Sequence, residues 1–149
     1  MTQIPIHLLI MIIVCFVWAG FMAAISFMES WLKFRAKGVE LVAGLSIGRL
    51  IFKTLNRVEW VFLVILWGGY ILAKPALLPM EALSYFLLSL ILISQTVWLL
   101  PVLDKRALAT IEGQKPPRAY WHIWFVGLEL IKFFLLLDAG ISLLHILKA

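Results

Sequence analysis

The sequence predicts an all-α integral membrane protein, a four-helix bundle forming one transmembrane domain over residues 1–149. Of these residues, 64% are hydrophobic and only 14% are charged, whereas soluble domains are nearer half apolar and a quarter charged. The apolar residues come in long blocks without charge, as membrane-spanning helices require. The charged residues gather between these blocks, so the pattern is that of a polytopic membrane protein.

We expect the first span at residues 4–28, because Ile4 to Met28 contains no Asp, Glu, Lys or Arg. At ~1.5 Å per residue this run exceeds the ~30 Å hydrocarbon core. It is too long for the apolar core of a signal peptide, and no positive residue precedes it, so we expect it to be retained. The other spans are expected at residues 58–78, 82–103 and 120–147.

The stretch from Glu29 to Glu59 is the only long segment that is dense in charge. Within it, Arg49, Lys53 and Arg57 recur at four-residue spacing and form one cationic stripe on a helix. This stripe predicts either an amphipathic helix in the membrane interface, with its cations toward anionic lipid, or the charged start of the second span. Gly44 and Gly48 form a GxxxG motif, which by itself is a weak indication of a homo-oligomer or a membrane partner.

The distribution of positive charge predicts the orientation of the chain. The connections after the first and third spans hold six and four of the 13 Lys and Arg residues. By the positive-inside rule, both connections face the cytoplasm and both termini lie outside. Without an organelle import signal, a bacterial inner membrane is the expected location. Because the basic residues lie beside apolar blocks, the net charge of +5 does not indicate a nucleic-acid partner.

Short motifs in both halves of the chain resemble small four-helix membrane proteins related to transmembrane protein 205, whose bacterial members form a domain family of unknown function. The motifs are Trp18-x-Gly20, Ser26-Phe27, Phe34, Ala43, Gly48 and Phe52, followed by Leu100-Pro101, Asp104 and Arg106. The resemblance implies a four-helix integral membrane protein and supplies no catalytic residues.

Two charged residues inside the fourth span are the strongest candidates for a site. Glu129 and Lys132 lie ~13 and ~18 Å from the start of this span, near the middle of the membrane. Gln95 of the third span falls near the same level, as do glycines of the other spans, Gly68 and Gly69 of the second and Gly20 of the first. Ionisable residues at this depth usually mark a substrate, ion or proton site. We therefore expect a polar pocket of Glu129, Lys132 and Gln95, walled by the glycines; the alternative is an ion pair that locks the third and fourth spans together.

The function that these features predict is a small-molecule or ion binding or transport module. A membrane scaffold or accessory subunit is one alternative. Another is a redox protein in which His7 and His145, expected at similar outer levels, bind haem or a metal. Because serine-hydrolase, P-loop, zincin and dinucleotide-binding signatures are all missing, we expect no cofactor and, on balance, no enzymatic activity.

Overall fold

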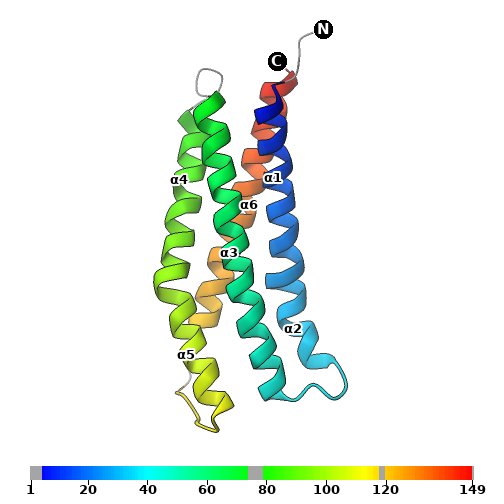
Figure 1. Cartoon of the computed structure of the whole chain (residues 1–149), viewed down its shortest axis with the longest axis vertical. Coiled ribbons are helices and arrows are strands. Elements are labelled where there is room, and N and C mark those ends of the chain that lie inside the picture. The colour runs from blue at the N-terminus through cyan, green and yellow to red at the C-terminus, as the bar shows by residue number, and fades with distance from the viewer. Residues whose placement is uncertain (1–4, 74–78, 118–119, 149) are drawn as a thin grey trace.

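The chain folds into an all-α bundle of four helical columns, as predicted (Figure 1). A computed structural model describes residues 5–73, 79–117 and 120–148. The first column comprises α1 (Ile6–Met22), the π-helix η1 (Ala23–Glu29), α2 (Ser30–Leu32) and the 3₁₀ helix η2 (Lys33–Arg35). The second is α3 (Leu41–Ala73); the third comprises α4 (Pro79–Ser94), the π-helix η3 (Gln95–Leu99) and α5 (Leu100–Ile111); the fourth is α6 (Trp121–Lys148).

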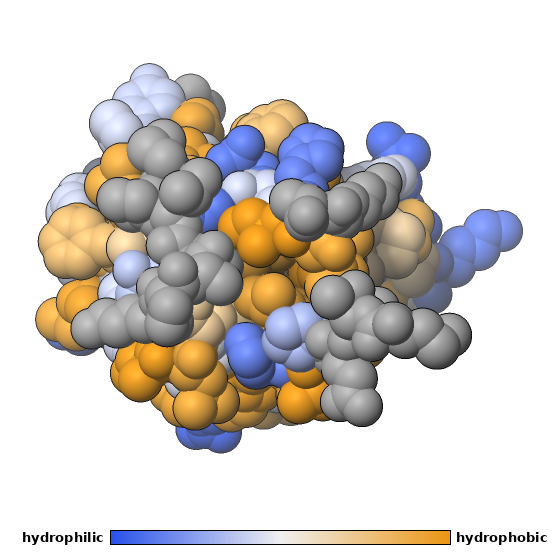
Figure 2. Space-filling view, turned by 90° about the horizontal axis from the view of Figure 1, so that it is seen from above, coloured by the Kyte–Doolittle hydropathy of each residue, from blue (hydrophilic) through white to orange (hydrophobic). Residues whose placement is uncertain are grey.

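Three helical segments of the described chain are long and apolar enough to cross a membrane, namely Ile6–Arg35, Glu81–Ile111 and Trp121–Leu147. Large apolar side chains are also exposed on every column; Ile13, Val64, Leu90 and Phe134 are examples. Figure 2 views the end at which α1 starts and α6 ends, and shows apolar side chains around much of the edge. A water-exposed bundle would place polar residues there, so both observations are compatible with an integral membrane protein.

The four columns pack as a closed ring around one core. The first column packs mainly against α6 and α3, α3 packs against α4 and α5, and α4 packs against α6. The largest apolar side chains of the core are fully buried, and they come from all four columns: Met11, Trp18, Met22, Leu66, Tyr85, Leu88, Leu92, Leu136 and Leu143. The start of α1 and the end of α6 lie at one end of the bundle, and the start of α3 lies at the other (Figure 1).

The second and third columns are longer than the predicted spans. Helix α3 begins at Leu41 and runs unbroken through the charged stripe, so the stripe lies on the second column and not on a separate helix. Helix α3 is not among the three segments that are long and apolar enough to cross a membrane. Its 33 residues correspond to about 50 Å, well beyond the ~30 Å hydrocarbon core. Residues 74–78 of the predicted span lie outside the described residues. The third column likewise continues past the predicted end at residue 103, as far as Ile111.

Two columns contain a π-helical segment, in which each turn holds an extra residue. In the third column this segment, η3, lies directly before α5, whose second residue is Pro101. Proline has no N–H group and its ring crowds the preceding turn, which accounts for the widened turn there. The segment η1 contains no proline, and we have no sequence-based reason for it. Both segments carry a side chain of the site described next.

Candidate functional site

Lys132 of α6 lies between two carboxylates in the interior of the bundle. Its Nζ donates a hydrogen bond to Glu59 Oε1 over 2.5 Å and lies 2.7 Å from Glu129 Oε1. The side chains of Lys132 and Glu129 are fully buried, and that of Glu59 is 3% exposed. Buried ions cost several kcal/mol each unless they are paired and hydrogen-bonded. The three charged groups therefore depend on one another for their stability in this position.

Neutral donors complete the contacts of the two carboxylates. Trp18 Nε1 donates to Glu59 Oε1 over 3.0 Å. Ser26 Oγ donates to Glu129 Oε2 over 2.7 Å, and Gln95 Nε2 donates to Glu129 Oε1 over 2.8 Å. We call the six residues the polar network: Trp18, Ser26, Glu59, Gln95, Glu129 and Lys132. Every column contributes at least one of them, so the polar network connects all four.

Helical periodicity explains why these charges face inward. Glu129 and Lys132 are three residues apart on α6 and therefore share a face. On α3, Glu59 lies four residues after the buried Leu55 and four before the buried Leu63. It occupies a position of the apolar stripe by which α3 packs into the core. The leucines on either side thus bring a carboxylate to the level of Lys132.

The charges of the polar network do not balance. Two carboxylates face one ammonium group, so one negative charge remains if both carboxylates are ionised. In addition, Gln95 Oε1 is buried without a hydrogen-bond donor among the described residues. A buried acceptor without a donor is costly. One bound proton or one small cation would neutralise the excess charge, and either is chemically suited to these oxygens.

The structure brings Glu129, Lys132 and Gln95 together as predicted from their depth in the spans. It does not bring the three glycines to them. Gly20 and Gly68 are exposed, with open space where a Cβ would lie, and Gly69 faces the side chain of Met11. The predicted depth was wrong for α3. Glu59 lies at the level of Lys132, and Gly69 follows Glu59 by ten residues, which is about 15 Å along the helix. Ligand binding by the predicted residues stays a prediction.

Three members of the polar network were missed in the sequence. Glu59 follows Lys53 and Arg57 closely, so it looks like the last residue of the charged stretch that begins at Glu29, although the span expected at residues 58–78 contains it. Its four-residue spacing from Leu55 and from Leu63 is the sequence signal that could have placed it on the buried face of the helix. Trp18 and Ser26 carry no charge, and nothing in an apolar span distinguishes them from residues that face lipid or the core.

The cationic stripe makes ion pairs within the bundle. Arg49 contacts both oxygens of Asp104, at 2.6 and 3.1 Å, and Lys53 Nζ lies 3.0 Å from Asp104 Oδ1. The hydrogen bond with Asp104 raises the pKa of Arg49 above its usual range. Arg57 is exposed. Arg49 and Lys53 thus connect α3 to α5, and contact of the stripe with anionic lipid stays a prediction.

The two histidines considered as haem or metal ligands lie on helix ends that meet at one end of the bundle. His7 is in the first turn of α1 and His145 is in the last turn of α6 (Figure 1). Within residues 5–73, 79–117 and 120–148, no group of three or more His, Cys, Asp or Glu side chains is placed to hold a metal ion. Haem binding by this pair stays a prediction.

Comparisons of the chain with protein-family models, with curated proteins and with solved structures find no match. The resemblance to proteins related to transmembrane protein 205 therefore stays a prediction. The functional conclusion depends on the geometry of the polar network alone.

Proposed function

We propose that this protein is an ion-binding membrane module whose polar network binds a proton or a small monovalent cation as part of a transport or coupling function. The observation that carries the proposal is the unequal number of buried charges, two carboxylates against one ammonium group. An ion pair that only locked two helices together would need one of each. The second carboxylate adds a desolvation cost that Lys132 alone does not offset.

The surroundings of Gln95 and Ser26 support the same proposal. The amide nitrogen of Gln95 donates to Glu129, and its Oε1 accepts no hydrogen bond from the part of the chain that the structure describes. Ser26 and Gln95 both lie in π-helical segments, which occur frequently at functional sites in helices. The polar network thus combines excess negative charge, a spare acceptor and irregular backbone at one level of an apolar bundle. Ionisable groups inside membrane spans mark ion and proton pathways by default.

The proposal includes the orientation and location predicted from the charges. The end of the bundle with the two basic connections faces the cytoplasm, and both termini lie outside a bacterial inner membrane. Six and four of the 13 Lys and Arg residues lie in these connections, as the positive-inside rule expects of cytoplasmic segments. The proposal also includes contact of the cationic stripe with anionic lipid, for which the exposed side chains of Lys53 and Arg57 are available.

Infrared difference spectroscopy tests the proton-binding form of this proposal. After a pH jump on the purified protein in liposomes, we expect a change in the C=O stretch of a buried carboxyl group. The change should be lost in Glu59→Gln or Glu129→Gln, because either substitution removes the excess negative charge. Glu81→Gln is the matched control: Glu81 is also buried, its carboxylate accepts a hydrogen bond from Ser142 and it lies outside the polar network.

Cation binding is tested on the same variants. If the polar network takes a cation, Na⁺, K⁺ or Li⁺ raises the midpoint of thermal unfolding of the wild type and of Glu81→Gln, but not of Glu129→Gln. Circular dichroism establishes that each variant is folded. The proposal is contradicted if the folded variants keep the carboxyl change in the infrared spectrum and no cation raises the unfolding midpoint of the wild type. The polar network would then serve only to hold the helices together.

A further inference from the structure

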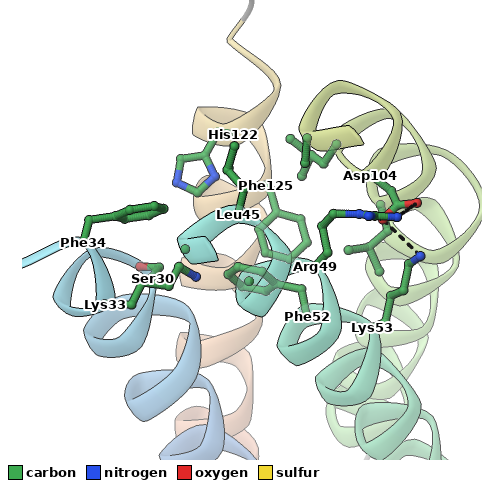
Figure 3. Close-up of a pocket in the computed structure, with 15 residues that line it drawn as sticks. Ser30, Lys33, Phe34, Leu45, Arg49, Phe52, Lys53, Asp104, His122 and Phe125 are labelled. Carbon is green, nitrogen blue, oxygen red and sulfur yellow. Dashed lines mark hydrogen bonds and ion pairs between the residues drawn. The ribbon is translucent and has the colours of Figure 1, made fainter. Parts of the chain in front are cut away.

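A cavity of about 290 Å³ opens at the basic end of the bundle, between the first column, the start of α3, α5 and the start of α6 (Figure 3). Most of its wall is apolar and includes Phe34, Leu45, Phe52, Leu100 and Phe125. Its volume is at the lower end of the range of ~300–1,000 Å³ for ligand pockets. The cavity therefore has room for a compact group, and its open side allows a longer ligand to extend outward.

The charged side chains of the cavity are mainly cationic. Lys33, Arg49 and Lys53 line it together with a single carboxylate, Asp104. Asp104 is already held by Arg49 and Lys53. Lys33 lies on the opposite side, near Ser30 and His122 (Figure 3). The wall thus carries a net positive charge, and Lys33 is the cation that Asp104 does not neutralise.

The amine of Lys33 is held in an apolar setting. Its side chain is 10% exposed, and Nζ lies 5.4 and 5.5 Å from the ring centroids of Phe34 and Phe52. Among the described residues, the one carboxylate paired with Lys33 is that of Glu29, whose Oε2 lies 3.2 Å from Nζ. An ammonium group that is mostly removed from water gains more from an added anion than an exposed one does.

The GxxxG motif leaves room for this amine against α3. A Cβ on Gly48 would come within 2.6 Å of Lys33 Nζ, and a Cβ on Gly44 would overlap the ring of Phe34. Because both positions are glycine, the end of the first column lies directly against α3. The motif thus serves a contact within the chain and places Lys33 at the cavity.

We propose that this cavity binds an amphipathic anion, with its phosphate or carboxylate group at Lys33 and His122 and its hydrocarbon body along the phenylalanine and leucine wall. Anionic phospholipids and free fatty acids both have this chemistry. The site does not depend on the proposed ion binding, although it lies close to the polar network. Ser30 and Phe125 of the cavity are each four residues, about 6 Å, from Ser26 and Glu129 of the polar network on the same helical columns.

Native mass spectrometry of the delipidated protein in neutral detergent tests the proposal. The probes are dioleoyl phosphatidic acid, oleate, dioleoyl phosphatidylcholine and inorganic phosphate. We expect phosphatidic acid or oleate to bind more tightly than phosphatidylcholine by roughly tenfold or more, since the choline cation leaves phosphatidylcholine without net negative charge. Preference for phosphatidic acid identifies a phospholipid as the source, and preference for oleate identifies a fatty acid.

Two variants and one control variant locate the binding. Lys33→Gln should remove the preference for the anionic probes, whereas Lys105→Gln, which removes one exposed charge at the same end, should retain it. Leu45→Trp fills the cavity and should weaken the binding of both phosphatidic acid and oleate. The proposal is overturned if the wild type binds neither phosphatidic acid nor oleate more tightly than phosphatidylcholine, or if inorganic phosphate binds as tightly as the anionic amphiphiles. Both comparisons use the wild type, so they hold even if a variant fails to fold.

Discussion

At the scale of single residues, Lys132 carries the positive charge of the polar network, and its amine contacts carboxylates from two helices. Glu129, Lys132 and Gln95 could be predicted from sequence, since charged or strongly polar residues inside an apolar run are unusual and their depth follows from the helical rise. Glu59 could not be found by that reasoning, because it is the last residue of the charged stretch from Glu29 to Glu59 and does not lie inside an apolar run.

Substitution of Lys132 by methionine removes the only ammonium group of the polar network. We expect Lys132→Met to lower the free energy of unfolding by roughly 3–5 kcal/mol, since Glu59 and Glu129 would remain buried without a cation. Denaturation by SDS in mixed micelles measures this change. The triple variant Glu59→Gln/Glu129→Gln/Lys132→Met should recover most of the loss. Wild-type stability of Lys132→Met would mean that the two carboxyl groups do not require the ammonium group.

At the scale of elements, the sequence predicts the four helical columns but not their ends. The apolar blocks determine where a helix can cross the membrane. They do not determine where it stops, because α3 and α5 continue as regular helix into their polar segments. The ion pairs of Asp104 with Arg49 and Lys53 hold these extensions together. Asp104 is 55 residues from Arg49 and 51 residues from Lys53 in the chain. Periodicity within one helix cannot predict contacts between residues so far apart.

Two neighbouring glycines of α3 provide a test of packing between α1 and α3. A Cβ on Gly69 would overlap the side chain of Met11, whereas a Cβ on Gly68 would meet open space. We therefore expect Gly69→Ala to destabilise the bundle by about 1–3 kcal/mol through overpacking. Gly68→Ala should be neutral or stabilising by up to about 1 kcal/mol, because alanine favours helix. Thermal unfolding in detergent compares the two, and equal midpoints would contradict this account of the α1–α3 contact.

At the scale of the whole molecule, the ends of the bundle differ in charge. The start of α3 and the end of α5 carry Arg49, Lys53 and Arg106, and the cavity lies at this end. Sequence composition was sufficient to predict an all-α bundle, since the long apolar blocks permit little else. It could not predict the cavity, which forms only where the first column, α3, α5 and α6 meet.

The orientation of the bundle can be measured directly. We expect a C-terminal alkaline phosphatase fusion to be active and a C-terminal green fluorescent protein fusion to be dark, because the basic connections hold the opposite end in the cytoplasm. Fusions within the connection after α5 should give the reverse result. If the C-terminal green fluorescent protein fusion is fluorescent, the C-terminus lies in the cytoplasm and the basic end lies outside. Contact of the basic end with lipid on the cytoplasmic face would then be excluded.

The π-helical segments have a consequence for insertions and deletions. Each residue of an α-helix turns the chain by about 100°, whereas a π-helical turn takes up one extra residue without that rotation. Loss of one residue such as Ala24, which is exposed, would return η1 to ordinary α-helical turns. Lys33 would then keep its place at the cavity, whereas loss of one residue from the regular helix α1 would rotate the rest of the first column by about 100°. Relatives of this chain should therefore differ in length by one residue within η1 and η3 more readily than within α1 or α6.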